Sequence, residues 1–129
     1  MCLECVMTKK QIKSSFHLKL CGERIDGFKV VRSHNKRAIF HGKQAYWPGR
    51  TIKRKIKSSP ALLYGRYGNP VYECGIHLFL TREGAQKYVC YSSHEIIVSV
   101  TFSRKSVIVW GIDCNCPVVV VKTCRVEKE

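Results

Sequence analysis

The sequence predicts an α+β domain built mainly of antiparallel β-strands, with one clear helix at about residues 81–91. Short segments rich in Val, Ile, Phe and Tyr recur along the chain, separated by Gly, Pro and Ser. One segment alone combines a helix start signal with apolar residues at helical spacing. The length of 129 residues suits one domain, which we assign to residues 16–129, after a loosely ordered stretch at residues 1–15.

The first half of the chain predicts several short strands: residues 16–22 (FHLKLCG), 28–32 (FKVVR), 37–41 (RAIFH) and 43–47 (KQAYW), with a turn at 23–27. Residues 51–57 (TIKRKIK) follow as a strand. Alternation puts its lysines on one face and Ile52, Arg54 and Ile56 on the other. A strand with one cationic face suits the edge of a sheet, because charge discourages further pairing.

Residues 71–102 predict a strand, a helix and a second strand. Apolar residues dominate 71–80, with Gly75 breaking the run. Thr81 suits the N-cap, and Glu83 places a negative charge in the first turn. Ala85 and Tyr88 fall on one helical face, and serines at 92 and 93 end the helix. Residues 96–102 (IIVSVTF) form the strongest predicted strand.

The C-terminal segment predicts the strands that complete the sheet. Arg104 and Lys105 suit a hairpin turn between residues 96–102 and a strand at 106–112 (SVIVWGI). A turn at 113–117 then leads to residues 118–126 (VVVVKTCRV), which close the sheet.

The net charge of +14 is uneven along the chain. Residues 1–60 carry 15 Lys and Arg against 3 Asp and Glu, whereas residues 61–129 carry 8 against 6. Such asymmetry predicts a polyanionic partner: nucleic acid or a nucleotide first, an acidic host protein second. We expect the cations of the first sixty residues to form one continuous patch.

The expected binding residues are the cations around residues 51–57 and the aromatic residues before them, since nucleic-acid surfaces combine cations for phosphates with aromatic faces for bases. The alternative for this strand is a solvated edge with no ligand. The predicted set is Lys43, Tyr46, Trp47, Arg50, Lys53, Arg54, Lys55, Lys57 and Arg66. No base-reading motif accompanies them, so no sharp sequence preference is predicted.

Eight cysteines make up about 6% of the chain, below the density typical of a disulfide scaffold. Cys2 and Cys5 with Cys114 and Cys116 would suit a zinc site only if the two ends of the chain meet. Their spacing is irregular for zinc, so we expect free thiols and no cofactor.

Catalysis is a secondary hypothesis that rests on His41, His77 and Tyr72. Together they would line a cleft for a nucleotide or serve as an acid–base pair. A hydrogen-bonded structural role is the main expectation for His77, because it lies in an apolar strand. We therefore expect a protein without enzymatic activity.

No apolar run approaches the length needed to span a bilayer, and the N-terminus lacks the pattern of a signal peptide. We expect an intracellular protein of the host cytoplasm or nucleus that is not secreted and has no membrane partner. The sequence leaves the oligomeric state open.

Residues 75–88 (GIHLFLTREGAQKY) resemble the central motif of an uncharacterised domain found in phages and large DNA viruses. In that domain a segment like residues 28–31 and a Y-x-x-G motif like 46–49 precede the central motif, and a Val-rich strand follows. The resemblance implies a small viral accessory domain that interacts with its host.

A fainter resemblance is to ADP-ribosyltransferases, in the order of His41-Gly42, the strand at 74–79 and the helix at 85–88. It implies an enzyme using NAD, or a protein that sequesters nucleotides. The chain departs from that pattern, because Asp113 is the only carboxylate between residues 96 and 126, where the family places its catalytic Glu.

Overall fold

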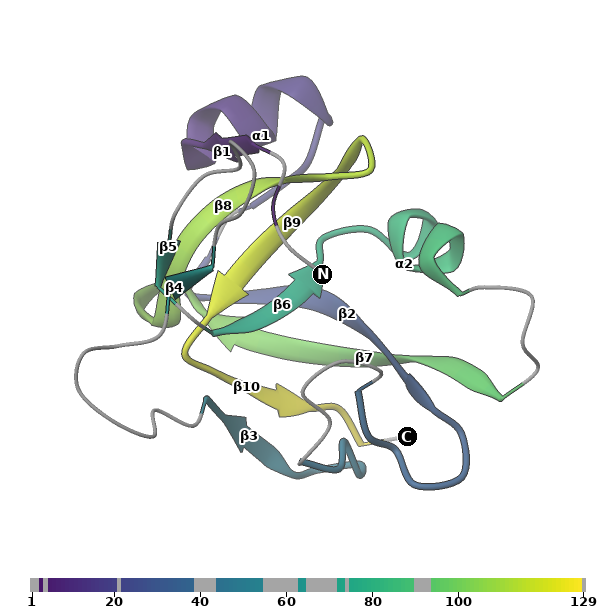
Figure 1. Ribbon diagram of the computed structural model, residues 1–129. Coiled ribbons are helices and arrows are strands. Elements are labelled where there is room, and N and C mark those ends of the chain that lie inside the picture. Colours follow the sequence, from purple (N-terminus) through teal and green to yellow (C-terminus); the bar gives the residue numbers. More distant parts are fainter. Residues whose placement is uncertain are drawn as a thin grey trace.

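The computed structural model describes residues 3, 5–20, 22–38, 44–54, 63–64, 72–73, 75–89 and 94–128. They form a single α+β domain around one eight-stranded antiparallel sheet, which confirms the predicted fold class (Figure 1). The strand order is β1-β8-β9-β6-β2-β7-β10-β3. The strands of this sheet are β1 (Cys5–Met7), β2 (Arg24–Arg32), β3 (Thr51–Lys53), β6 (Ile76–Phe79), β7 (Glu95–Ser103), β8 (Val107–Asp113), β9 (Cys116–Val121) and β10 (Thr123–Val126).

Three helical segments and a separate strand pair complete the described elements. Helix α1 (Lys9–Ser15) contacts β8, and helix α2 (Arg82–Tyr88) contacts β2, β6 and β7. The 3-10 helix η1 (Arg104–Ser106) joins β7 to β8. Strands β4 (Leu63–Tyr64) and β5 (Tyr72–Glu73) pair only with each other.

The sheet curls strongly, because β9 and β10 are consecutive in the chain but separated by three strands in the sheet. Only Lys122 lies between them, yet β9 pairs with β8 and β6 whereas β10 pairs with β7 and β3. The inner face of the curl carries the larger apolar core, which includes Ile52, Leu78 and Phe102. Ile12 of α1 joins this core.

A second core lies on the outer face, beneath α2. Phe79, Ala85 and Val118 are buried there, and Tyr88 packs against them with its ring 5.4 Å from that of Phe79. Strand β9 is buried at every position because both of its faces are covered. This helix covers only part of the outer face.

The predicted unit over residues 71–102 is confirmed in β6, α2 and β7. Thr81 is the N-cap of α2, and its side chain accepts a hydrogen bond from the Gly84 backbone N–H at 3.0 Å. The helix ends at Tyr88, before the predicted serines. A Cβ at Gly75 would lie 2.6 Å from Ile108 Cδ1 and 2.8 Å from the Val121 carbonyl oxygen, so close packing excludes a side chain there.

Several sequence predictions were wrong. Residues 5–15 are not loosely ordered: β1 pairs with β8, and α1 begins with a capping box between Thr8 and Gln11. Of the predicted strand at 16–22, residues 16–20 are a turn followed by irregular chain, and residues 24–27 of the predicted turn belong to β2. The segments at 37–41 and 43–47 contribute only isolated bridges among the described residues.

The predicted hairpin at Arg104 and Lys105 was also wrong. The segment is η1, and β7 and β8 are not neighbours in the sheet. The true hairpin joins β8 to β9, where Cys114 and Asn115 have φ values of 51° and 61°. Two consecutive positive φ angles are typical of the two-residue turns that suit the twist of antiparallel strands.

Candidate nucleic-acid interface

The uncovered part of the outer sheet face is polar and cationic. Strands β2, β7, β10 and β3 are adjacent here, and their inward residues, such as Val100, Phe102 and Cys124, are buried. Because side chains alternate across a strand, the intervening residues point outward. We call this surface the basic sheet face and define it by Arg24, Asp26, Thr51, Lys53, Ser99, Thr101, Ser103, Thr123, Arg125 and Glu127.

The strand register aligns these side chains in rows. Asp26 lies opposite Thr101, Thr101 opposite Arg125, and Arg125 opposite Thr51. Lys53 lies opposite Thr123 in the neighbouring row. The face therefore sets cations beside hydroxyl groups, with the carboxylates of Asp26 and Glu127 among them. Cations and hydroxyl groups are the side chains that most often contact nucleic-acid phosphates.

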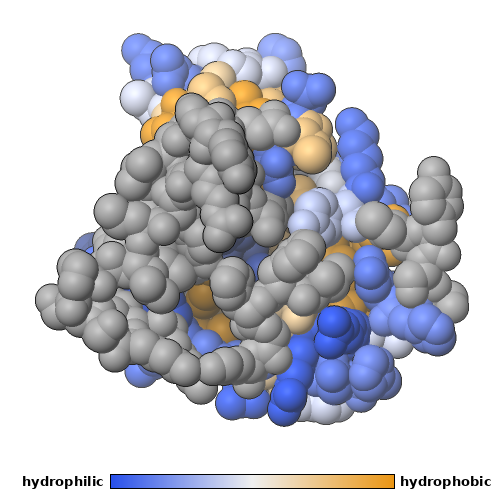
Figure 2. Space-filling view, viewed as in Figure 1, coloured by the Kyte–Doolittle hydropathy of each residue, from blue (hydrophilic) through white to orange (hydrophobic). Residues whose placement is uncertain are grey.

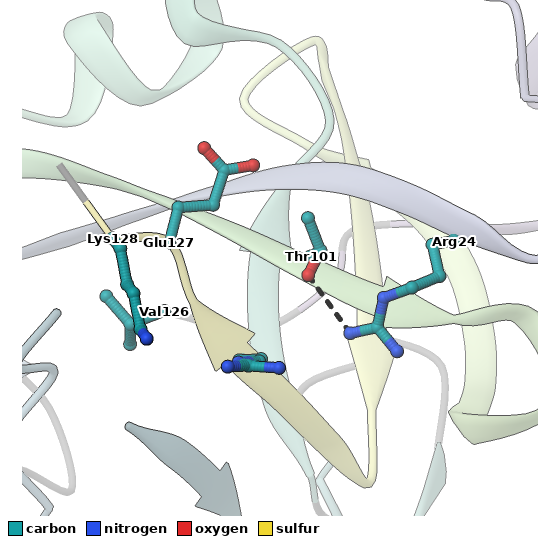
Figure 3. Close-up of a pocket in the computed structure, with 6 residues that line it drawn as sticks. Arg24, Thr101, Val126, Glu127 and Lys128 are labelled. Carbon is teal, nitrogen blue, oxygen red and sulfur yellow. Dashed lines mark hydrogen bonds between the residues drawn. The ribbon is translucent and has the colours of Figure 1, made fainter. Parts of the chain in front are cut away.

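A shallow pocket of about 340 Å³ opens on this face (Figure 3). A nitrogen of the Arg24 guanidinium donates a hydrogen bond to the Thr101 hydroxyl at 3.0 Å, which joins β2 to β7. The residues that line the pocket are Arg24, Thr101, Arg125, Val126, Glu127 and Lys128.

The turn that carries Trp47 lies beside the end of β10. The Gly49 N–H donates to the Val126 carbonyl, and the Val126 N–H donates to the Arg50 carbonyl, both at 2.9 Å. Trp47 is 47% exposed, and the Lys36 ammonium lies 5.8 Å from the centroid of its ring. The turn beside β10 thus exposes an aromatic ring, the kind of group on which an unpaired base can stack.

Arg82 marks the border of the face next to α2. Its guanidinium lies 5.2 Å from the centroid of the Phe28 ring and donates to the Ser99 hydroxyl at 3.3 Å. The ring contact orients this cation on the surface of the sheet.

Of the sequence-predicted binding residues, Trp47, Arg50 and Lys53 are exposed at or beside the basic sheet face. Tyr46 requires correction: it is 4% exposed and belongs to the inner core, so its ring cannot stack on a base. Arg54 is half-buried, as expected from its alternation with exposed Lys53. Lys43, Lys55, Lys57 and Arg66 lie outside the described residues.

The expectation of one continuous N-terminal patch was wrong. Lys10 and Lys13 are exposed on α1, at the opposite end of the molecule from β3 (Figure 1). Hydrophilic side chains accordingly appear over both ends in Figure 2, above around α1 and below around β3 and the C-terminal end of β10. The basic sheet face instead combines cations from both halves of the sequence.

Sequence reasoning missed Arg24, Thr101, Arg125 and Lys128. The overall charge of residues 61–129 is nearly balanced, which hid the contribution of that half. The signal was the alternation in residues 123–127 (TCRVE), where buried Cys124 and Val126 separate three outward polar residues. These residues lie near Arg24 only because of the strand order, which cannot be read from any short segment of the sequence.

The inner face holds a cation of a different kind. Lys29 shares the inward face of β2 with Ile25 and Val31, and its ammonium donates to the His77 carbonyl at 2.9 Å. Removal from water lowers the pKa of Lys29 to about 8, although the nearby Cys124 raises it slightly. Burial raises the pKa of the Cys124 thiol to about 12 and also raises the pKa of Tyr46.

Of the three residues proposed for catalysis, the structure describes the side chain of His77. His77 is 5% exposed within β6, in agreement with its expected structural role. His41 and the side chain of Tyr72 lie outside the described residues.

The proposed zinc ligands come only partly together. Pairing of β1 with β8 sets Cys5 opposite Ile112, close to the turn that carries Cys114, while Cys2 lies outside the described residues. Cys5 and Cys114 are exposed and Cys116 is buried. Within the described part of the chain, no three His, Cys, Asp or Glu residues form a group that could hold a metal ion.

Comparison with protein-family models, with curated proteins and with solved structures finds no match to this chain. None of the helices in the described ranges is long and apolar enough to cross a membrane.

Proposed function

We propose that this protein is a non-enzymatic accessory domain, of viral or phage type, that binds nucleic acid through the basic sheet face. The observation that carries the proposal is the convergence of Arg24, Lys53 and Arg125 on one surface among threonine and serine hydroxyls. Their charge would be neutralised by backbone phosphates, and the hydroxyls would donate to phosphate oxygens.

Single strands are the preferred substrate class under this proposal. Trp47 offers an exposed ring beside the face, and base stacking on an aromatic ring requires an unpaired base. Cations and hydroxyls recognise the backbone and carry little sequence information, so binding should depend weakly on sequence. DNA and RNA present the same phosphate charge to this surface.

The test is fluorescence anisotropy with labelled single-stranded and duplex DNA and RNA, in salt from about 50 to 200 mM. With four backbone phosphates engaged, the plot of log K against log salt should have a slope of about −3 for a single strand. The double variant Arg24→Ala/Arg125→Ala should reduce the slope by about 1.4 and weaken binding on the order of tenfold.

The matched control removes the same charge elsewhere. Lys10→Ala/Lys13→Ala lies on α1, outside the proposed interface, and should leave the salt slope unchanged. Equal losses in both double variants would show that binding follows net charge and not this face. An absence of binding at low salt would reject nucleic acid and leave an acidic host protein as the partner to seek by pull-down.

A further inference from the structure

The pocket on the basic sheet face has a charge that suits one particular ligand group. Three of its lining residues are cations and one is a carboxylate, which leaves a net charge of +2. A phosphate monoester carries about −1.5 to −2 at neutral pH, whereas a backbone phosphodiester carries one negative charge. The charge in the pocket therefore matches the end of a strand better than its interior.

The two arginines of the pocket are held on either side of Thr101. Arg24 donates to the Thr101 hydroxyl at 3.0 Å, and Arg125 lies directly opposite Thr101 across the β7–β10 pair. A guanidinium presents several N–H donors in a plane, so two of them can share the three terminal oxygens of a monoester. The hydroxyl of Thr101 restricts the orientation of one of these groups before any ligand arrives.

The third cation is placed by the turn beside β10. A Cβ at Gly49 would lie 3.3 Å from Lys128 Cε and 3.5 Å from its Cγ, so the stem of Lys128 runs over this glycine. Gly49 also has a φ of +81°, which other residues rarely adopt. In Figure 3 the carboxylate of Glu127 points away from the amino group of Lys128, so the acidic group does not occupy the cationic side.

We propose that this pocket is a phosphomonoester subsite that receives the terminal phosphate of a bound nucleic-acid strand. The inference rests on the proposed function, since the rest of the strand would lie along the basic sheet face. Arg24, Arg125 and Lys128 contact the phosphate, and Thr101 is a positioning residue for Arg24. A strand end is preferred because its monoester offers more negative charge and one more free oxygen to these cations than an internal phosphodiester does.

The experiment compares one single-stranded oligonucleotide in three forms, with a 5′-phosphate, a 3′-phosphate or hydroxyls at both ends. Competition in fluorescence anisotropy gives the affinity of each form for the full-length protein. We expect one of the phosphorylated forms to bind about tenfold more tightly than the hydroxyl form, which also identifies the end that is recognised. Equal affinity of all three forms would overturn the subsite and leave the proposed nucleic-acid binding intact.

Variants separate the pocket from the face. Arg24→Ala and Arg125→Ala should abolish the gain from the terminal phosphate, whereas Lys53→Ala, outside the pocket, should weaken all three forms by the same factor. Thr101→Val should reduce the gain by a larger factor than it weakens the hydroxyl form, because it also removes the group that orients Arg24. A full gain in Arg24→Ala would contradict the assignment.

The pH dependence provides a readout that a structural defect would not reproduce. The second pKa of a phosphate monoester is about 6, so the gain should shrink as the pH falls from 7.5 to 5. Inorganic phosphate and a mononucleoside monophosphate serve as separate competitors. If no oligonucleotide binds but these small anions still protect the protein in a thermal-shift assay, the subsite stands and the proposed function fails.

Discussion

The two faces of strands β2, β7, β10 and β3 are made by alternate residues of the same segments, yet they have different roles. Inward residues such as Val100 and Phe102 are fully buried, while their neighbours Thr101 and Ser103 lie on the basic sheet face. The inner face therefore determines stability, and the outer face is free to carry charge. A change on one of these faces should therefore leave the property carried by the other nearly unaffected.

The largest effect should be the difference in unfolding free energy between Phe102→Ala and Thr101→Ala, two substitutions at adjacent positions of β7. Phe102 is 0% exposed and packs against Trp110 with ring centroids 6.4 Å apart, so its truncation should cost about 3–5 kcal/mol of unfolding free energy. Thr101→Ala should cost less than about 1 kcal/mol, because its side chain lies outside the core. Urea denaturation monitored by circular dichroism measures both. Similar losses in the two variants would show that the faces are not separate.

Lys29, the cation on the inner face, should make the free energy of unfolding depend on pH. Lys29 has a folded pKa of about 8 against a usual value of 10.5. Between these values the unfolded chain binds more protons than the folded chain, so the free energy of unfolding should rise with pH by about 1–3 kcal/mol in total. Cys124 acts in the opposite direction above about pH 9, since its thiol ionises first in the unfolded chain. The two effects oppose each other above about pH 9, so the rise in stability should level off there.

The Lys29 effect is tested by denaturation at a series of pH values. Lys29→Met retains the apolar stem and should remove the rise between pH 8 and 9, whereas Lys10→Met, at an exposed position of α1, should keep it. A rise of unchanged size in Lys29→Met would mean that the buried ammonium is not its origin.

Trp47 tests whether the aromatic ring at the margin contributes to binding. Trp47→Ala should weaken single-stranded nucleic acid by about 1 kcal/mol, or roughly fivefold, and leave duplex binding nearly unchanged. Its exposed ring predicts a negligible change in unfolding free energy. Equal effects on single strands and duplexes would exclude stacking as its role.

The sequence predicted those parts of the fold that depend on local pattern. The helix start at Thr81 and the strand at β7 follow from capping and from β-branched composition within a few residues. The pairing partners did not follow: Arg104 and Lys105 suit a hairpin locally, but the curl of the sheet places β8 far from β7 in strand order.

The binding site was only partly predictable for the same reason. Lys53 and Trp47 were found because they lie in a basic and aromatic segment. Arg24 and Arg125 are 101 positions apart in the sequence and meet only through the strand order β2-β7-β10. Tyr46 was misassigned because it precedes a basic segment, although its own ring belongs to the inner core.

The most direct test of the account is an NMR titration of the ¹⁵N-labelled protein with a single-stranded oligonucleotide. We predict that the largest amide shift changes occur in β3, in β10 and in the residues of β7 around Thr101, and that they extend to Arg24 and Trp47. Amides of α1 should move little, although Lys10 and Lys13 of this helix are exposed too. Shift changes centred on α1, with β10 and Thr101 unaffected, would contradict the claim that the basic sheet face binds nucleic acid.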